Sequence, residues 1–419
     1  MTWRQVTLGT LELESGGVIQ TGPFGSQLHA SDYSTTGTPV VMPTNIRGLR
    51  VSTVGIARVS PEHVSRLSRH KLQVGDIVYS RRGDVEKCAL ITPEEAGWLC
   101  GTGCLLVRVG GAKVDPRCLA YALSLPDTRN WISQHAVGAT MPNLNTEVLR
   151  EVPVLLPPVD EQLSIAATLG ALDDKIESNR RSSAFASQLV AAEFQFLLAN
   201  SEVSEVPLGD VVESTKGVSY KSADLRPSRT SLVTLKSFDR YGGYKREGLK
   251  QYVGPYKRSQ VLAPGDFAVA QTDLTQGAEV VGRAVRVPPD ASADVLVASL
   301  DLLVVRPGTD HLYPEFLYGV LTDEVFRQFC RSRTSGTTVL HLAGDAIPTY
   351  NAPWVAPDLQ ASYAARVQPL LSRIDALNRE ELALTALRDA LLPELLSGRM
   401  RVSAYADSTD LTDDEPENA

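Results

Sequence analysis

Residues 358–398 read DLQASYAARVQPLLSRIDALNREELALTALRDALLPELLSG, and this stretch decides the fold. Ten of its positions follow an alternating spacing of four and three residues, and eight of those ten carry apolar side chains. They are Tyr363, Val367, Leu370, Ile374, Leu377, Glu381, Leu384, Arg388, Leu391 and Leu395. Apolar residues sustained at this spacing over more than four heptads predict a coiled-coil helix. Pro369 is expected to kink this helix or to lie near its start, and Pro393 to kink its last turn.

Residues 159–200 repeat the same phase at positions that are 198 lower. This stretch is apolar at its two ends and polar in the middle, around Asn179 and Ser183. Two helices of matching phase, separated by globular sequence, predict an antiparallel pair about 50 Å long. The alternative is two long amphipathic helices that each pack on their own domain. The apolar seam is expected to contain Leu169, Leu172, Ile176, Val190, Leu197, Val367, Leu370, Ile374, Leu377, Leu384, Leu391 and Leu395.

The offset of about 198 residues also recurs outside the helices. The matched pairs are Val6-x-Leu8-Gly9 with Val206-x-Leu208-Gly209, Leu105–Arg108 with Leu303–Arg306, and Asp160-x-Gln162 with Asp358-x-Gln360. Gly75-Asp76 matches Gly265-Asp266 at a shorter offset of 190. Because the matches share one order and nearly one offset, they predict a duplicated chain.

Each repeat begins with short β-branched and aromatic runs separated by Gly, Pro, Asp and Asn, which are typical of strands and turns. The sequence therefore predicts an α+β fold with a pseudo-twofold internal duplication. Two β-rich mixed domains, 1–157 and 201–354, are separated by two long helices, 158–200 and 355–400, that form the antiparallel coiled coil. Residues 401–419 carry six carboxylates against one arginine and are expected to form a disordered acidic tail.

The formal net charge is −8, but two segments are strongly basic. Residues 216–258 hold eleven Lys or Arg residues with interleaved aromatic residues, and residues 44–82 hold eight Lys or Arg residues. Basic clusters with aromatic side chains are typical of a nucleic-acid-binding surface. The alternative is a solvated basic face over tyrosines of the core.

Common catalytic motifs are absent from the sequence. It has no Gly-rich phosphate loop ending in Lys-Ser/Thr, no HExxH, no tandem CxxC and no Asn/Asp-Pro-Pro-Tyr/Phe signature of amino-methyltransferases. The run Asp84-Val85-Glu86-Lys87 contains nuclease-like residue types, but metal-dependent cleavage needs further spaced carboxylates. The sequence therefore predicts a protein that binds rather than one that catalyses.

Four cysteines, Cys88, Cys100, Cys104 and Cys118, fall within 31 residues. Four thiolates can hold zinc, but this spacing is not that of a zinc knuckle or ribbon, and free cysteines are commonly small core residues. We therefore expect no bound metal. Cysteines without a regular framework, no secretory signal and no apolar run of membrane-spanning length predict a cytoplasmic protein.

Four segments resemble the specificity (S) subunit of type I restriction–modification systems. Residues 19–46, IQTGPFGSQLHASDYSTTGTPVVMPTNI, are similar to the opening of its target-recognition domains, and residues 74–82, VGDIVYSRR, to a later stretch of those domains. Residues 152–181, VPVLLPPVDEQLSIAATLGALDDKIESNRR, resemble the junction into its first conserved helix, and residues 387–402 resemble its ending. The second repeat departs from this pattern, because Ala356-Pro357-Asp358-Leu359-Gln360 stands at its junction and Gln271-Thr272 stands where Ser80-Arg81 stands in the first.

The resemblance implies a function in phage defence. Each recognition domain would read one half of a bipartite, gapped site in double-stranded DNA, with the halves about one helical turn (~34 Å) apart. The helices would dock two methyltransferase (M) subunits and, through them, the endonuclease/translocase (R) subunits. Catalysis, S-adenosylmethionine, ATP and magnesium would belong to those partners, and this chain would not be an enzyme by itself.

Base reading needs Arg or Lys for guanine and Asn or Gln for adenine, on loops that reach the major groove. The candidate DNA-binding residues of the first domain are Asn45, Arg47, Arg81, Arg82 and Lys87. Those of the second are Tyr220, Lys221, Lys236, Arg240, Tyr241, Tyr244, Lys245, Gln271, Thr272 and Gln276. For any one of them, a phosphate contact or a surface role competes with base reading.

Three other functions remain open at this point. The chain could be the recognition subunit of another phage-defence methyltransferase, a coiled-coil adaptor that binds no DNA, or a self-sufficient nuclease. Duplex binding that weakens steeply with salt would argue against the adaptor. Cleavage of DNA by the isolated chain with magnesium would favour the nuclease.

Overall fold

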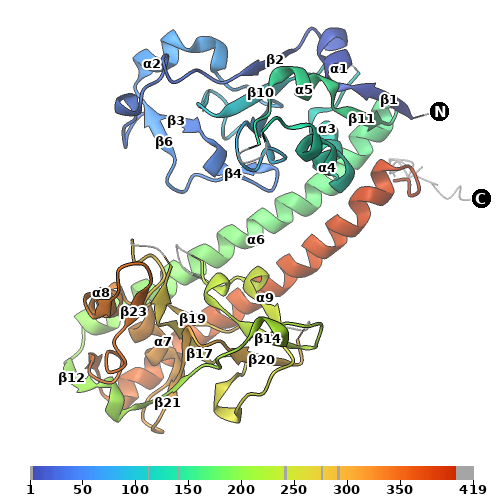
Figure 1. Cartoon of the computed structure of the whole chain (residues 1–419). Helices are drawn as coiled ribbons and strands as arrows, with labels where there is room; N and C mark the ends of the chain where they lie inside the picture. The colour runs from blue at the N-terminus through green and yellow to red at the C-terminus, as the bar shows by residue number, and fades with distance from the viewer. Residues whose placement is uncertain are drawn as a thin grey trace, which may run out of the picture. The chain divides into compact units, whose positions relative to one another are not determined.

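The computed structural model describes residues 3–111, 113–138, 142–239, 243–274, 277–289 and 293–402. The chain divides into two compact units (Figure 1). The first unit contains Met1–Ile176 and Ala383–Ala419, and the second contains Glu177–Leu382. The two long helices, α6 (Val159–Ala199) and α9 (Pro357–Leu396), each contribute one part to each unit.

The first unit is built on a four-stranded antiparallel sheet in the order β2-β10-β7-β8. Its strands are β2 (Val18–Thr21), β10 (Cys104–Arg108), β7 (Ile77–Ser80) and β8 (Cys88–Leu90). A second sheet has the order β6-β3-β9, in which β3 (Thr38–Val41) lies between β6 (Ala57–Val59) and a parallel partner, β9 (Leu99–Cys100). Two further antiparallel pairs join the distant strands β1 (Arg4–Thr7) and β11 (Pro153–Leu156), and β4 (Ile46–Arg47) and β5 (Arg50–Val51), which form a hairpin. The helices are α1 (Leu8–Ser15), α2 (Pro61–Arg66), α3 (Pro116–Ser124), α4 (Pro126–His135) and α5 (Thr146–Glu151).

The second unit repeats this plan, which confirms the internal duplication that the sequence predicts. Its four-stranded sheet has the order β13-β21-β17-β19, with β13 (Val212–Lys216), β21 (Leu302–Pro307), β17 (Phe267–Ala270) and β19 (Ala284–Arg286). A second sheet, β15-β14-β20-β16, again holds one parallel pair, β14 (Thr230–Val233) with β20 (Val295–Ala298), flanked by β15 (Lys250–Gln251) and β16 (Val261–Leu262). The strand β12 (Ser204–Pro207) pairs with β24 (Asn351–Trp354) as β1 does with β11. A small sheet of β18 (Thr272–Asp273), β23 (Leu340–Leu342) and β22 (Thr334–Ser335) and the helices α7 (Pro314–Thr322) and α8 (Glu324–Ser332) complete the unit.

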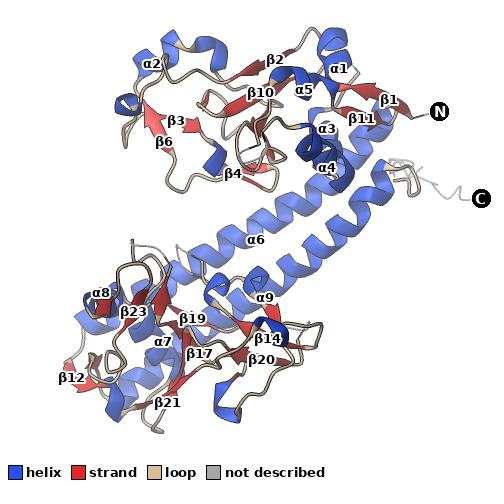
Figure 2. Cartoon of the chain, viewed as in Figure 1, coloured by secondary structure: helices blue, strands red, loops and turns tan. Residues whose placement is uncertain are grey.

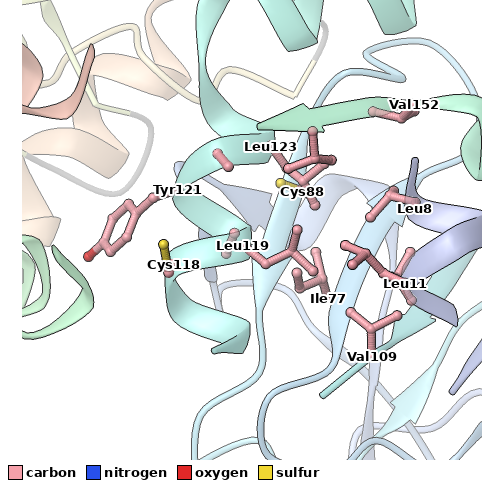
Figure 3. Close-up of a cluster of buried hydrophobic side chains, with 14 of the residues drawn as sticks. Leu8, Leu11, Ile77, Cys88, Val109, Cys118, Leu119, Tyr121, Leu123 and Val152 are labelled. Carbon is pink, nitrogen blue, oxygen red and sulfur yellow. The ribbon is translucent and has the colours of Figure 1, made fainter. Parts of the chain in front are cut away.

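Strands and helices are mixed in both units, as an α+β fold requires (Figure 2). The central strands β7 (IVYS) and β17 (FAVA) are buried at every position, because the sheet is covered on both faces. One face of the first sheet packs on α1 and on α3, whose residues Cys118–Leu123 are all buried. Figure 3 shows Leu8 and Leu11 of α1, Ile77 of β7 and Leu119 of α3 gathered in this core.

Two glutamines fix the long helices to the short ones in the same way. Gln162 of α6 donates from Nε2 to the carbonyl of Pro157 (2.8 Å), and its Oε1 accepts the N–H of Asp115, the N-cap of α3 (2.8 Å). Gln360 of α9 repeats both contacts in the second unit, with Val355 and with Tyr313, the N-cap of α7. Both glutamines are buried. The second junction, residues 356–360, differs from the first in sequence, but it retains the glutamine that joins the long helix to the start of the short one.

The long helices pack antiparallel, as predicted. In the second unit, Arg180 pairs with Glu381 (2.7 Å) while Glu193 pairs with Arg366 (2.9 Å), so α9 numbers fall as α6 numbers rise. Asn179, in the polar middle of the seam, is buried and donates to Glu380 (2.9 Å). In the first unit, Arg388 of α9 pairs with Asp173 of α6 (2.8 Å).

The twelve predicted seam residues are all buried or half-buried. Leu169 and Leu395 belong to the core of the first unit, and Val190, Leu197 and Val367 to the core of the second. The ends of the helices therefore pack on their own globular cores as well as on each other, so the two hypotheses describe different parts of the same helices. Helix α9 begins at Pro357 and runs through Pro369 and Pro393 to Leu396, so Pro369 does not lie near its start. The proposed acidic tail, from residue 403 on, lies outside the described residues.

Candidate nucleic-acid interface

The loops that carry most of the predicted contact residues meet at one edge of the sheet in each unit. In the first unit, Thr21 at the end of β2 pairs with Leu105, and Ser80 at the end of β7 pairs with Cys104, so both strands end beside the start of β10. The end of β3 reaches the same edge, because Gly101 donates its N–H to the carbonyl of Val41 (2.9 Å). We call the segments that follow these strands, residues 22–28, 42–47 and 81–87, the first loop edge.

The second unit has an equivalent edge. Lys216 at the end of β13 pairs with Leu303, and Ala270 at the end of β17 pairs with Leu302. The end of β14 joins them, because Ser299 donates its N–H to the carbonyl of Val233 (3.0 Å). Residues 217–221, 234–238 and 271–274, which follow these strands, form the second loop edge. The duplication therefore places some cations of each basic segment, Arg47, Arg81 and Arg82 in the first unit and Lys221 and Lys236 in the second, at corresponding edges of the fold.

Arg81 is held firmly at the first loop edge. Its N–H donates to the carbonyl of Gly103 (2.8 Å), and its own carbonyl accepts the N–H of Leu144 (2.8 Å). Its guanidinium carbon lies 5.9 Å from the centre of the Phe24 ring. The neighbouring Arg82 is exposed, while Lys87, at the far end of the same loop, pairs with Asp84.

Asn45 does not face outward. It is buried at the end of a 3₁₀ turn, where its Oδ1 accepts the N–H of Met42 (3.1 Å) and its Nδ2 donates to the carbonyl of Ser52 (3.0 Å). Both halves of the amide are therefore used inside the fold, and we assign Asn45 to the structure of this turn. Arg47, two residues later, is exposed in the β4–β5 hairpin.

In the second unit, Lys221 and Lys236 are exposed at the loop edge. Tyr220 is half-buried beneath Lys250, whose Nζ donates to the tyrosine oxygen (3.1 Å). Lys245 forms an ion pair with Asp239. Tyr244 is half-buried, and its main chain pairs with that of Phe238 in an isolated antiparallel β-bridge.

Two further candidates serve the fold. Gln271 donates from Nε2 to the carbonyls of Leu300 and Leu302, and the buried Thr272 donates to Asp301 (2.9 Å). Gln271 takes the place of Arg81, because Leu342 donates its N–H to the carbonyl of Gln271 (2.8 Å) as Leu144 does to that of Arg81 (2.8 Å), so the predicted match of Gln271-Thr272 with Ser80-Arg81 is wrong by one residue. The polar groups of Gln271 and Thr272 close the turn before β21. Arg240, Tyr241 and Gln276 lie outside the described residues.

The structure leaves only part of the basic charge available to a partner. Arg229 makes two hydrogen bonds to Asp294, which lower the pKa of that carboxyl group below its usual value. Arg66 donates to the carbonyl of Gln27 (2.9 Å) and Arg69 to Gln20 (3.1 Å). In the part of the chain that the structure describes, the exposed Arg47, Arg82, Lys221 and Lys236 make no ion pair, so these are the cations best placed to meet phosphate.

The clustered cysteines give no support for a zinc site. Cys88 and Cys118 project into the hydrophobic core from β8 and α3 (Figure 3), and burial raises the pKa of each to about 12. A buried thiol with such a pKa is protonated at neutral pH and packs as a small core residue. Among the described residues, no three His, Cys, Asp or Glu side chains are arranged to hold a metal ion. The same residues include no helix that is both long and apolar enough to cross a membrane.

The seam prediction missed a second apolar face of α6. Phe185, Leu189 and Phe196 are 68%, 48% and 63% exposed in the second unit. At 100° per residue they fall within about 40° of one another, on a different side of the helix from seam residue Val190. We call them the α6 stripe. The spacing of four and seven residues is visible in the sequence, but it lies beside the stronger seam pattern.

The comparisons with known proteins agree with this fold. Residues 34–184 match the model of the type I restriction modification DNA specificity domain. The putative type I restriction enzyme MjaX specificity subunit of Methanocaldococcus jannaschii is 26% identical over 146 residues, which are 33% of this chain and 34% of that protein. The match thus spans about a third of the length of this relative.

A solved structure of low sequence identity shares the architecture. The S subunit of a type I restriction–modification system from M. genitalium is 17% identical and superimposes with a TM-score of 0.58 over 94% of this chain and 96% of that chain. The HsdS subunit from Thermoanaerobacter tengcongensis is 18% identical, with a TM-score of 0.35 over 95% of this chain and 97% of that chain. In its matched domain, in its sequence and in its duplicated fold, the chain resembles the specificity (S) subunits of type I restriction–modification systems, which confirms the resemblance that the sequence predicts.

Proposed function

We propose that this chain is the DNA specificity subunit of a type I restriction–modification complex, in which each unit reads one half of a bipartite, gapped DNA site. The observation that carries the proposal is the pair of loop edges, which occupy corresponding places in the duplicated fold and are both basic. A duplicated recognition unit suits a site with two halves, because each copy can diverge to read its own sequence.

The exposed cations at these edges suit the first stage of binding. Arg47 and Arg82 in the first unit, and Lys221 and Lys236 in the second, would neutralise phosphates and set the register of the chain on the duplex. Arginine is also the side chain that reads guanine by two hydrogen bonds in the major groove.

The long helices would dock the methyltransferase subunits. The α6 stripe leaves large apolar side chains in water on the second unit, and Leu387 of α9 is exposed on the first. Exposed apolar rows on a helix are typical of sites that receive another helix. The α6 stripe would receive one M subunit and the region around Leu387 the other, and the R subunits would join through them. S-adenosylmethionine, ATP and magnesium would be bound by these partners, and this chain would supply only recognition.

The test is adenine-methylation mapping by single-molecule sequencing in cells that express this chain with its candidate methyltransferase. We expect a gapped two-part motif that appears only when this chain is present. Cells that lack this chain but keep the methyltransferase are the control. Methylation of an ungapped motif, or methylation that does not depend on this chain, would overturn the proposal.

A further inference from the structure

One aromatic residue at the first loop edge is held out in water. Phe24 is 55% exposed in the loop that follows β2, and Gly25, Ser26 and Gln27 beside it are exposed as well. Single exposed apolar side chains are common on protein surfaces, so exposure alone assigns no role to Phe24. What distinguishes Phe24 is its place at the loop edge, beside the cation of Arg81.

The loop fixes Phe24 in this position. The N–H of Phe24 donates to Oε1 of Gln27 (3.0 Å), and its carbonyl accepts the N–H groups of Gln27 (2.8 Å) and Leu28 (3.1 Å). Arg66 closes the turn from outside by donating to the carbonyl of Gln27 (2.9 Å). A side chain held in one place before binding loses little conformational entropy when it binds.

Arg81 supports the ring electrostatically. Its guanidinium lies 5.9 Å from the ring centre, within reach of a cation–π attraction, and its main chain is anchored on both sides. Arg81 lies at the ring, Arg66 binds the same loop at Gln27, and the exposed Arg82 follows Arg81 in the chain, so this part of the loop edge combines an apolar ring with positive charge. A partner that complements this surface must be anionic outside and offer flat apolar faces inside, which describes duplex DNA.

The second unit also pairs an aromatic residue with a cation in the loop that follows β13, the counterpart of β2, although its cation comes from β15 and not from the loop after β17. Gly22 directly follows β2 and Gly217 directly follows β13, and a Cβ atom on either would lie about 2 Å from a main-chain oxygen, that of Gly101 or of Ser299. The loop that follows Gly217 brings Tyr220 under Lys250, whose Nζ lies 5.4 Å from the ring centre. Tyr220 is half-buried and its hydroxyl accepts a hydrogen bond from Lys250. Of the two rings, the exposed ring of Phe24 is therefore the one that a partner can contact directly.

We propose that Phe24 is a wedge that inserts at a base step of the half-site bound by the first unit, with Arg81 holding the ring in position. The inference rests on the proposed function and adds a way to distort DNA that hydrogen-bonding residues lack. Insertion of an apolar side chain unstacks the step, and pyrimidine–purine steps yield most easily. Phe24 would therefore contribute specificity through the deformability of the step as well as affinity.

The experiment uses the complex of the full chain with its methyltransferase. The probes are duplexes of about 30 base pairs that carry the motif found by methylation mapping, with 2-aminopurine placed in turn at each position of the half-site read by the first unit. Unstacking raises the fluorescence of this base. Apart from the target adenine, which the methyltransferase flips out of the stack in either case, we expect one position to brighten with the wild-type complex and to stay dark with Phe24→Ala, whose Kd rises about tenfold. The slope of log Kd against log salt should not change, since Phe24 carries no charge.

Two variants control the result. Phe24→Leu keeps an apolar side chain of similar reach and should retain most of the fluorescence change. Val74→Ala removes an equally exposed apolar side chain (59%) at the opposite end of β7 and should behave as wild type. Equal fluorescence and Kd for wild type and Phe24→Ala, or no bright position with wild type, would overturn the wedge while leaving the proposed function intact. A wild-type complex that fails to prefer the mapped motif over an unrelated duplex overturns both.

Discussion

Among single residues, the aspartates of the two matched Gly-Asp pairs, Asp76 and Asp266, stabilise turns of the fold. Asp76, 1% exposed, accepts two hydrogen bonds from Arg108 (2.7 and 2.6 Å) and the N–H of Gln73 (2.7 Å). Asp266 repeats this arrangement with Arg306 and with the N–H of Ala263 (2.8 Å). The Gly-Asp pairs therefore match between the repeats because each closes the turn that leads into the central strand.

We expect Asp76→Asn to lower the free energy of unfolding of the first unit by about 2–3 kcal/mol, because it leaves the Arg108 guanidinium without its charged partner in a largely buried place. Urea unfolding followed by tryptophan fluorescence measures the change. Asp84→Asn, which breaks an exposed pair with Lys87, is the matched control and should cost about 1 kcal/mol or less. Equal effects of the two substitutions would contradict the assignment.

Glu12 gives the first unit a dependence on acid. Its side chain binds Arg150 (2.7 and 3.0 Å) and the N–H of Ile19 (2.8 Å), and the bond to Arg150 is the main cause that lowers the pKa of Glu12 below its ordinary value of 4.5. A carboxylate with a lower pKa in the folded chain stabilises the fold above its ordinary pKa and loses that contribution as the pH falls through the lowered value. Stability contributed by Glu12 should therefore be complete near neutrality and decline below about pH 4.5.

Thermal unfolding of Glu12→Gln between pH 3 and pH 7 tests this expectation. The variant should be less stable than wild type at neutral pH, and the difference should shrink as the pH falls, because wild type alone loses an ion pair on acidification. Glu62→Gln, at an exposed position of α2, should follow the wild-type curve. A Glu12→Gln deficit that stays constant with pH would refute the role of the charge.

At the scale of elements, the long helices combine three kinds of surface. Their ends enter the hydrophobic cores, their polar middle is joined by pairs such as Asn179 with Glu380, and the α6 stripe remains outside. The buried Asn179 fixes the register of the two helices at some cost in stability, since a polar group at a seam position tolerates few alternative partners.

The α6 stripe can be tested directly. We expect Phe185→Asp with Leu189→Asp to change the free energy of unfolding by no more than about 0.5 kcal/mol, because both side chains are exposed. The same pair should weaken binding of the methyltransferase subunit at least tenfold, since charges would enter an apolar contact. Size-exclusion chromatography of the mixed subunits measures the association. Ala191→Asp, exposed on another side of α6, is the control and should bind normally; unchanged binding by the double variant would refute this docking face.

At the scale of the whole molecule, two similar units carry different loop edges. The first offers arginines at positions 47, 81 and 82, whereas the second offers lysines at 221 and 236 and closes its β17 loop with Gln271 and Thr272. Arginine and lysine differ as DNA contacts, because only the arginine fork matches guanine or phosphate with two parallel hydrogen bonds. The two units should therefore differ in how strongly their specificity depends on these cations.

This difference predicts separable half-sites. Arg81→Ala with Arg82→Ala should relax or weaken recognition of one half of the methylated motif, and Lys221→Ala with Lys236→Ala should affect the other half. Each pair should also reduce the salt slope of DNA binding by about one to two, in proportion to the phosphate contacts that are lost. Methylation mapping of both variants reads out each half separately. Equal loss in both halves from either pair would show that the edges do not act independently.

Three features of this protein follow from local patterns of the sequence: the two long helices, the duplication and the basic segments. The 4-3 spacing of apolar residues defined both long helices to within a few residues at each end, because a helix needs only a continuous face. The constant offset of the matched residues established the duplication, since both copies must fill the same core. The basic segments and the family resemblance predicted a DNA partner, because the charge and the motifs of a chain can be read without its fold.

The tertiary structure decided which side chains are available. Asn45, Gln271 and Thr272 have the composition of base-reading residues, yet the fold uses their hydrogen-bonding groups to close its own turns. The sequence did not predict a role for Phe24. Its exposure and its contact with Arg81 depend on the pairing of strands that are more than fifty residues apart in the chain. Burial and hydrogen-bond partners are set by long-range pairing, which local sequence patterns do not encode.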